Sequence, residues 1–206
     1  MGTYKKSSET RAHILEIAFG LFLERGYYAT TLADIAKEAG ISTGTLYRHF
    51  PTKGEMLFEI RRVSHARLRG VLESLDESLP LLEKLSILTR ENSAATSNRL
   101  FWGQTNRTDD TNRELVLALR HEIYASLDSL RKEDMFRREL CEMYASLLKA
   151  EQRKGGLDPA IDVDLAGEAI AGYYLSKIDE GILDASVDAA QSTIDMMSVV
   201  IPRISR

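Results

Sequence analysis

The residues with the clearest chemistry lie between Leu32 and Phe50, in the sequence LADIAKEAGISTGTLYRHF. The second half of this stretch gathers short hydroxyl side chains, a glycine, a tyrosine and basic side chains. Hydroxyl and basic groups donate hydrogen bonds to phosphates and base edges, and a glycine lets the backbone approach its target closely. The pattern therefore indicates binding to a nucleic acid rather than catalysis.

Signals of catalysis are missing from the sequence. It contains no nucleophile beside a base, no glycine loop that would hold phosphates and no set of metal ligands at regular spacing. The four histidines, His13, His49, His65 and His121, are widely dispersed. We therefore expect a protein that is not an enzyme and that needs neither a cofactor nor a metal.

The spacing in the same stretch predicts a helix-turn-helix, which would hold these groups against DNA. The first helix needs a small residue where the second crosses it, here Ala36, and a glycine that reverses the chain, here Gly40. The apolar anchors are Ile35, Ala39, Ile41, Leu46 and Phe50. The residues left for the major groove and its flanking phosphates are Thr43, Gly44, Thr45, Tyr47, Arg48 and His49.

Local signals place the ends of the helices around this motif. Gly26 and Gly40 suit the left-handed conformation that stops a helix. Residues 31–34 have the spacing of a capping box, which would open the first helix of the motif. A second capping box at residues 52–55 precedes a long helix that we expect to run to about residue 75.

The stretch from Thr31 through Leu57, with Gly-Thr-Leu-Tyr-Arg-His-Phe followed by Lys53, resembles the DNA-binding head of the TetR family of bacterial transcriptional regulators. The resemblance covers about residues 8–57. It implies phosphate contacts from Thr31, Ser42, Thr45, Tyr47, His49 and Lys53, and it places Thr43, Gly44 and Arg48 nearest the base edges. The alternative is a three-helix bundle that touches no DNA, in which Tyr47 and His49 pack and Lys53 is solvated.

Apolar residues recur at intervals of three and four along nearly the whole chain, and strictly alternating β-branched runs are absent. This periodicity predicts an all-α fold. We expect a DNA-binding domain over residues 1–54 and a larger helical domain over residues 55–206. In the larger domain, a capping box at Thr111–Glu114 is expected to open a helix whose apolar stripe extends to Leu130.

Charge is unevenly divided along the 206 residues. Residues 1–70 hold eleven Lys and Arg against seven Asp and Glu, whereas the whole chain carries −4. The remaining residues therefore carry −8, so the attraction for phosphate is concentrated in the N-terminal part. No apolar run is long enough to span a membrane and no signal segment is visible, so we expect a cytoplasmic protein without a membrane partner. Cys141, the single cysteine, is expected to be a reduced thiol.

The resemblance also implies that the larger domain binds a small molecule between its middle helices. Trp102, the single tryptophan, stands beside polar residues and marks the most promising region. The candidates to line this site are His65, Asn98, Phe101, Trp102, Gln104, Arg120, His121, Tyr124 and Tyr144. The competing interpretation of each is an ordinary core or surface residue.

By the same resemblance, the last two helices, over about residues 163–183 and 187–201, form a dimer. Their apolar stripes could build an intermolecular four-helix bundle. The interface candidates are Ala169, Gly172, Tyr173, Ile194 and Met197. The alternative is that these helices complete the core of a single chain. A homodimer would set two recognition helices about one DNA turn apart, which suits a palindromic site.

These features predict a DNA-binding transcriptional regulator. We expect a repressor that an unidentified small-molecule effector releases from double-stranded operator DNA. A ligand-insensitive regulator or an activator would use the same DNA-binding head. The alternative from a different class is a helical enzyme that acts on a small molecule.

Overall fold

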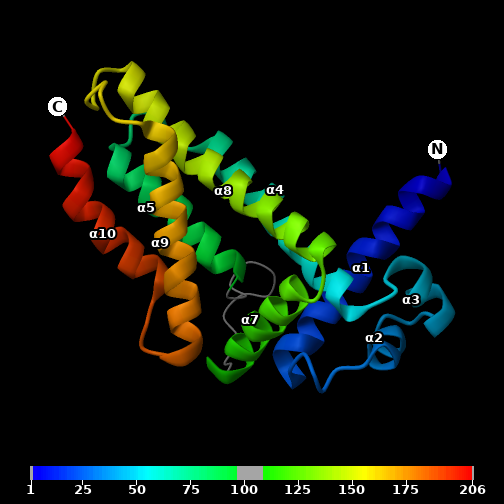
Figure 1. Ribbon diagram of the computed structural model, residues 1–206. Coiled ribbons are helices and arrows are strands. Elements are labelled where there is room, and N and C mark those ends of the chain that lie inside the picture. The colour runs from blue at the N-terminus through cyan, green and yellow to red at the C-terminus, as the bar shows by residue number, and fades with distance from the viewer. Residues whose placement is uncertain (1, 97–108, 206) are drawn as a thin grey trace. The chain divides into compact units, whose positions relative to one another are not determined.

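A computed structural model describes residues 2–96 and 109–205. Within them the secondary structure is helical apart from one isolated β-bridge between Leu157 and Ser205, which confirms the all-α prediction. The helices are α1 (Gly2–Arg25), α2 (Leu32–Glu38), α3 (Thr43–His49), α4 (Lys53–Ser74), α5 (Leu81–Thr96), α7 (Asp109–Tyr124), α8 (Leu127–Arg153), α9 (Val163–Leu183) and α10 (Ala189–Ile204) (Figure 1). None of these helices is both long and apolar enough to cross a membrane.

Contacts between residues divide the chain into two compact units. Unit 1 comprises residues 1–63 and 98–130, and unit 2 comprises residues 64–97 and 131–206. Helices α4 and α8 contribute residues to both units. The domain boundary predicted after residue 54 remains a prediction. The structure adds that α7, which we had expected in the larger domain, packs against α1 in unit 1.

Local signals form the short helices of unit 1 as predicted. Gly26 ends α1 with φ +91°, and Gly40 lies after α2 with φ +66°, a backbone region that other residues rarely adopt. The capping box at Thr31–Asp34 is confirmed, because the Thr31 side chain accepts from the Asp34 N–H and the Asp34 side chain accepts from the Thr31 N–H. Helix α3 begins after Ser42, whose hydroxyl accepts from the N–H of Thr45.

The core of unit 1 forms where α1, α2, α3, the start of α4 and α7 meet. Ile14, Phe22, Leu46 and Phe50 are fully buried there. Because these apolar residues lie three and four apart on each helix, one face of every helix is removed from water. This core fixes the orientation of α2 and α3.

Unit 2 is a helical bundle with a second core. Helix α10 packs along both α5 and α9, and α9 and α10 run side by side in Figure 1. Tyr144 of α8, Tyr174 of α9 and Met197 of α10 are almost completely buried in this core. Helices α8 and α9 approach closely at Gly167, where an added Cβ would lie 2.7 Å from the Ala145 nitrogen.

The prediction for residues 111–130 was wrong in two details. Helix α7 begins at Asp109, so Thr111 lies inside the helix rather than at its N-cap. The predicted apolar stripe is interrupted because α7 ends at Tyr124 and α8 begins at Leu127. The Ser126 hydroxyl accepts from the Ser129 N–H at 3.1 Å, which is the interaction of a residue that starts a new helix.

Candidate nucleic-acid interface

The second helix of the motif, α3, buries its apolar side and exposes its polar side. Leu46 and Phe50 are fully buried, and Ile35 of α2 is fully buried against them. Tyr47 is 53% exposed. The other exposed residues of this surface are Ser42, Thr43, Gly44 and Arg48, and Thr45 and His49 are half-buried. The structure therefore brings the predicted contact residues of α3 together on one element.

Hydroxyl groups at the start of α3 hold one another in place. The Ser42 hydroxyl lies 2.9 Å from the Thr45 hydroxyl, and the Thr45 hydroxyl accepts from Nη2 of Arg48 at 3.2 Å. Because these bonds join successive turns of one helix, they restrict the rotamers of all three side chains. The surface is preorganised for a ligand that accepts hydrogen bonds, such as a phosphate or a base edge.

Thr31, predicted to touch a phosphate, is exposed at the start of α2. Its hydroxyl also donates to Asp34 at 2.5 Å. The side-chain and backbone hydrogen bonds from Thr31 hold the pKa of the Asp34 carboxyl below its ordinary value. Asp34 therefore stays ionised and keeps Thr31 in place.

Arg11 of α1 is a residue of this site that sequence reasoning missed. Its Nη1 donates to the backbone carbonyl of His49 at 2.6 Å, and its guanidinium lies 4.1 Å from the centroid of the Phe50 ring. Its Nε also lies 3.6 Å from a carboxylate oxygen of Glu59. A cation at the C-terminal end of α3 satisfies an unpaired carbonyl and suits the helix dipole. Nothing local in the sequence pairs Arg11 with α3.

Lys53, also predicted to touch a phosphate, is the first residue of α4 and reaches the loop that joins α1 to α2. Its ammonium donates to the carbonyls of Tyr27 at 2.7 Å and Thr30 at 2.8 Å, and it lies 4.3 Å from the centroid of the Tyr27 ring. Burial lowers its pKa, and the charges of Glu122 and Glu114 partly oppose that shift.

These contacts contradict the alternative of a bundle without a DNA surface in two respects. Tyr47 is exposed instead of packed. Lys53 is bound to backbone carbonyls instead of being merely solvated. Tyr47 is therefore available to a partner of this surface instead of belonging to the core.

The candidates for the small-molecule site are divided between the two units. Arg120, His121 and Tyr124 belong to α7 in unit 1, where Tyr124 is 74% exposed. His65 and Tyr144 belong to unit 2 and are buried. The remaining four, Asn98, Phe101, Trp102 and Gln104, lie outside the described residues.

Several polar groups are buried in unit 2. The Tyr144 hydroxyl lies 2.9 Å from the hydroxyl of Thr89, and burial raises the pKa of Tyr144. The His65 ring packs against Phe136 with centroids 5.0 Å apart, and its Nδ1 lies 3.4 Å from a Glu139 oxygen. The predicted ligand-contacting roles of His65 and Tyr144 remain predictions.

The interface candidates differ in exposure. Ala169 and Gly172 are exposed on α9, whereas Tyr173 and Ile194 are half-buried. Met197 is fully buried in the core of unit 2, and its predicted role at the dimer interface remains a prediction. Its apolar stripe on α10 faces α5 and α9 of the same chain. The periodicity of a single helix does not tell whether such a stripe packs within one chain or against a partner chain.

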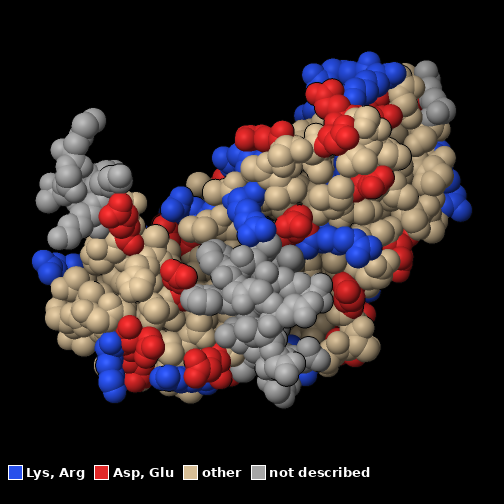
Figure 2. Space-filling view, turned by 180° about the vertical axis from the view of Figure 1, so that it is seen from behind, with Lys and Arg blue, Asp and Glu red and all other residues tan. Residues whose placement is uncertain are grey.

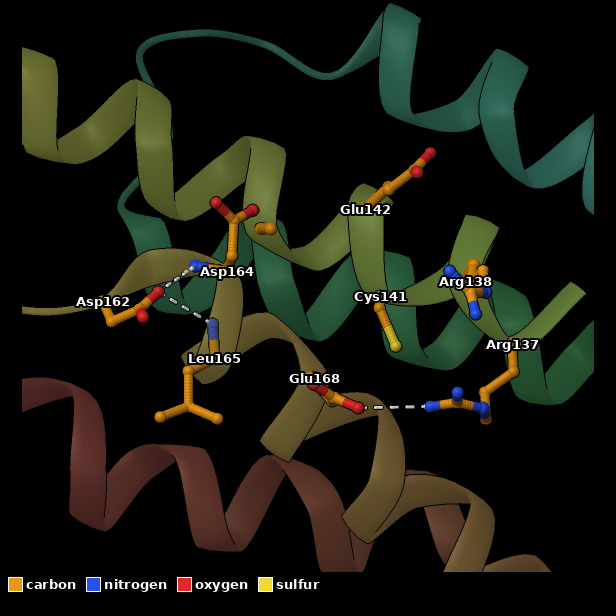
Figure 3. A pocket seen from close by; sticks show the side chains of 9 residues that line it. Arg137, Arg138, Cys141, Glu142, Asp162, Asp164, Leu165 and Glu168 are labelled. Carbon is orange, nitrogen blue, oxygen red and sulfur yellow. Dashed lines mark hydrogen bonds and ion pairs between the residues drawn. The ribbon is translucent and has the colours of Figure 1, made fainter. Parts of the chain in front are cut away.

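A polar pocket of about 570 Å³ lies between α8 and α9 in unit 2 (Figure 3). Arg137, Arg138, Cys141 and Glu168 are among its lining residues, and none of the five predicted ligand contacts that the structure describes is. Arg137 is paired with Glu168 at 3.2 Å and with Asp134 at 3.0 Å, and Arg138 is paired with Asp134 at 2.6 Å. The arginines of the pocket are thus committed to ion pairs within the protein. Burial raises the pKa of the Cys141 thiol, which favours its neutral form.

Surface charge is mixed on the face drawn in Figure 2. Over most of the described residues of that face, Lys and Arg are interspersed with Asp and Glu, and a cluster of Lys and Arg lies at the upper right. The excess of basic residues in the N-terminal part is therefore not concentrated on this face.

A helix-turn-helix whose second helix exposes hydroxyl, aromatic and basic side chains is the arrangement that DNA-binding regulators use. Residues 14–60 match the family model described as bacterial regulatory proteins, tetR family. The HTH-type transcriptional repressor KstR2 of Rhodococcus jostii is 34% identical over 163 residues, which cover 77% of this chain and 73% of that protein. The chain belongs to the TetR family of bacterial regulatory proteins, as its resemblance predicted.

Other similarities cover less sequence or concern the fold. The HTH-type transcriptional regulator AcrR of Shigella flexneri is 41% identical over 71 residues, so the matched part spans 34% of this chain and only 33% of AcrR. The crystal structure of reduced NemR of E. coli has a TM-score of 0.67 and covers 96% of this chain and 97% of NemR, at 18% identity. That similarity shows a shared fold along both units.

Proposed function

We propose that the protein is a repressor that binds a palindromic operator as a homodimer and is released by a small-molecule effector. The observation that carries the proposal is α3, which exposes Thr43, Gly44, Tyr47 and Arg48 while Leu46 is fully buried. In this geometry the N-terminal part of α3 can enter the major groove, and the capping hydroxyls can meet the phosphates. The repressor KstR2, similar over most of the chain, supports repression.

We place the dimer interface on α9 and α10. Large apolar side chains are exposed on both helices, with Leu165 62%, Leu183 85% and Val199 54% exposed. Gly172 of α9 has no side chain and would let a partner helix approach closely. A Cβ added there would have no atom of this chain within 4 Å. A second copy packed against this surface would remove the exposed apolar area from water. A homodimer in the cytoplasm could then reach operator DNA with two copies of α3.

We place the effector in unit 2. Its core contains the buried polar residues Thr89, Asn92 and Thr193 and the hydroxyl of Tyr144 among apolar side chains. A few hydrogen-bonding groups within an apolar core are what fix the orientation of a mainly apolar small molecule.

Selection of duplex DNA from a random library by the purified wild-type chain tests the proposal. We expect enrichment of a palindrome with half-sites about one helical turn apart, bound by a species that sediments as a dimer. Arg48→Ala should change the base preferred within each half-site and cost about 1–3 kcal/mol at that position. Lys149→Met, an exposed substitution in unit 2, should select the same palindrome. Failure of the wild-type chain to enrich any duplex at low salt would refute the proposal.

A further inference from the structure

Helix α7 is part of the DNA-binding unit. Leu115 and Ala118 of α7 are buried in the same core as Phe22 of α1 and Leu46 of α3. The head therefore includes an element that follows the helix-turn-helix by more than fifty residues in the sequence. Polar groups on α7 can consequently act on the elements that meet DNA.

Glu114 of α7 binds the loop between α1 and α2. One of its carboxylate oxygens accepts from the backbone N–H of Tyr28 at 3.0 Å. A Cβ added at Gly26 would lie 2.8 Å from the other oxygen, so the glycine leaves room for the carboxylate. We had expected Glu114 to cap its own helix, but it lies beyond the first turn of α7 and instead satisfies a donor of the head.

Glu122 binds the same loop from farther along α7. Its carboxylate accepts from the Tyr27 hydroxyl at 3.1 Å. The carboxylate also covers Gly54 in the first turn of α4, where an added Cβ would overlap it. A negative charge at the N-terminal end of a helix is favourable because the free N–H groups and the helix dipole are positive there. Glu122 therefore ties together the loop and the start of α4.

Lys53 binds the same loop through its carbonyl groups. The carboxylates accept from a hydroxyl and an N–H of Tyr27 and Tyr28, whereas the ammonium of Lys53 donates to the carbonyls of Tyr27 and Thr30. Burial and the charge of Glu122 raise the pKa of Tyr27, so its hydroxyl stays a donor. The loop is thus held through both its donors and its acceptors, next to Thr31 at the start of α2.

We propose that Glu114 and Glu122 are positioning residues for DNA binding, which act by holding the loop, Lys53 and the start of α2 in the arrangement that meets the phosphates. This inference rests on the proposed function. The inference predicts a change in DNA affinity opposite to the one that electrostatics alone would give. Removal of a negative charge from a DNA-binding surface should raise affinity by electrostatics alone, but removal of these two carboxylates should lower it.

The experiment compares Glu114→Ala/Glu122→Ala, Glu114→Gln/Glu122→Gln and wild type. Fluorescence anisotropy would measure the affinity of each for the duplex selected by the wild-type chain and for a random duplex. We expect the Ala pair to bind the selected duplex roughly 5–100-fold more weakly, a range typical of coupling between sites. The Gln pair should recover part of the affinity, because an amide oxygen still accepts a hydrogen bond. Exchange of the Tyr28 amide hydrogen should be faster in the Ala pair.

Glu38→Gln is the matched control. Glu38 is an exposed acid of α2, so its loss should leave affinity unchanged or raise it slightly. If the Ala pair binds the selected duplex as tightly as the control does, the inference is refuted and the proposed function is not. If the wild-type chain selects no duplex, the proposed function is refuted, and the inference that rests on it is refuted with it. Loss of cooperative unfolding in both pairs would also overturn the inference, because the carboxylates would then be needed for folding.

Discussion

Lys53→Met separates two roles of one side chain. In the structure the ammonium donates to two loop carbonyls, and an ammonium has three N–H groups. The remaining N–H can donate to a DNA phosphate, as the family resemblance implies. Methionine keeps an unbranched stem of similar length over Tyr27 but removes every donor, so both roles should be lost together while the packing is retained.

The effect on stability follows from the contacts. A hydrogen bond with a charged partner contributes about 1.5–3 kcal/mol to stability, and a partly exposed cation near an aromatic ring about 0.5 kcal/mol. Lys53 is half-buried, and water can replace it at the carbonyls in the variant. We therefore take the lower limit for each bond, add the contact with the ring, and expect the free energy of unfolding to fall by about 3.5 kcal/mol.

The effect on DNA binding follows from the charge. Each phosphate contact contributes about 0.9 to the slope of log affinity against log salt concentration. Loss of one contact in each protomer of a dimer should therefore reduce the slope by about 2. Affinity should fall for all sequences, since a phosphate contact carries no base preference.

Urea unfolding and the salt dependence of duplex binding measure the two effects independently. The control is Lys149→Met, which removes an exposed ion pair between Lys149 and Asp164 in unit 2 and should change stability by less than about 1 kcal/mol. An unfolding free energy within about 0.5 kcal/mol of wild type would refute the structural role. An unchanged salt slope would refute the phosphate contact while leaving the structural role intact.

Two further predictions concern packing and pH. Gly167→Ala should destabilise unit 2 by about 1–3 kcal/mol in urea unfolding, because its Cβ would press on the Ala145 backbone, whereas Gly70→Ala, in open space on α4, should be neutral or stabilising. The pKa of Asp34 is lowered in the folded state from the ordinary value of 3.8. The ionised carboxylate therefore contributes to the free energy of unfolding above pH 3.8, and this contribution is lost as the pH falls through the lower pKa of the folded state. The difference in unfolding free energy between wild type and Asp34→Asn should therefore shrink between pH 6 and pH 2, and a difference that stays constant would contradict the capping role.

The helix ends near the DNA surface were predictable because their causes are local. The capping box joins Thr31 to Asp34, and Ser42 caps α3 through a residue three positions on. The turn after α2 needs a positive φ, which Gly40 supplies. Such interactions depend on residue types within one helical turn, so a linear pattern contains them. The break between α7 and α8 is equally local, but the apolar stripe on both sides of Ser126 concealed it.

Contacts between distant residues were not predictable in this way. Arg11 reaches the carbonyl of His49 across 38 positions, and Tyr27 reaches Glu122 across 95. A charged residue on a helix is most often exposed to solvent, and the sequence pattern is the same when it instead binds a distant residue. Met197 shows the same limit, since an apolar stripe records that a face is buried but not which chain covers it.

The sequence by itself therefore determined the DNA-binding motif, because caps, glycines and the apolar face of α3 are properties of short segments. It also determined which groups α3 presents, since burial of Leu46 and Phe50 leaves Tyr47 and Arg48 on the other side. Only the tertiary structure decided what holds that motif in place. The folding of α7 into the head brings two carboxylates and Lys53 onto one loop, a result of packing between segments that no local spacing encodes.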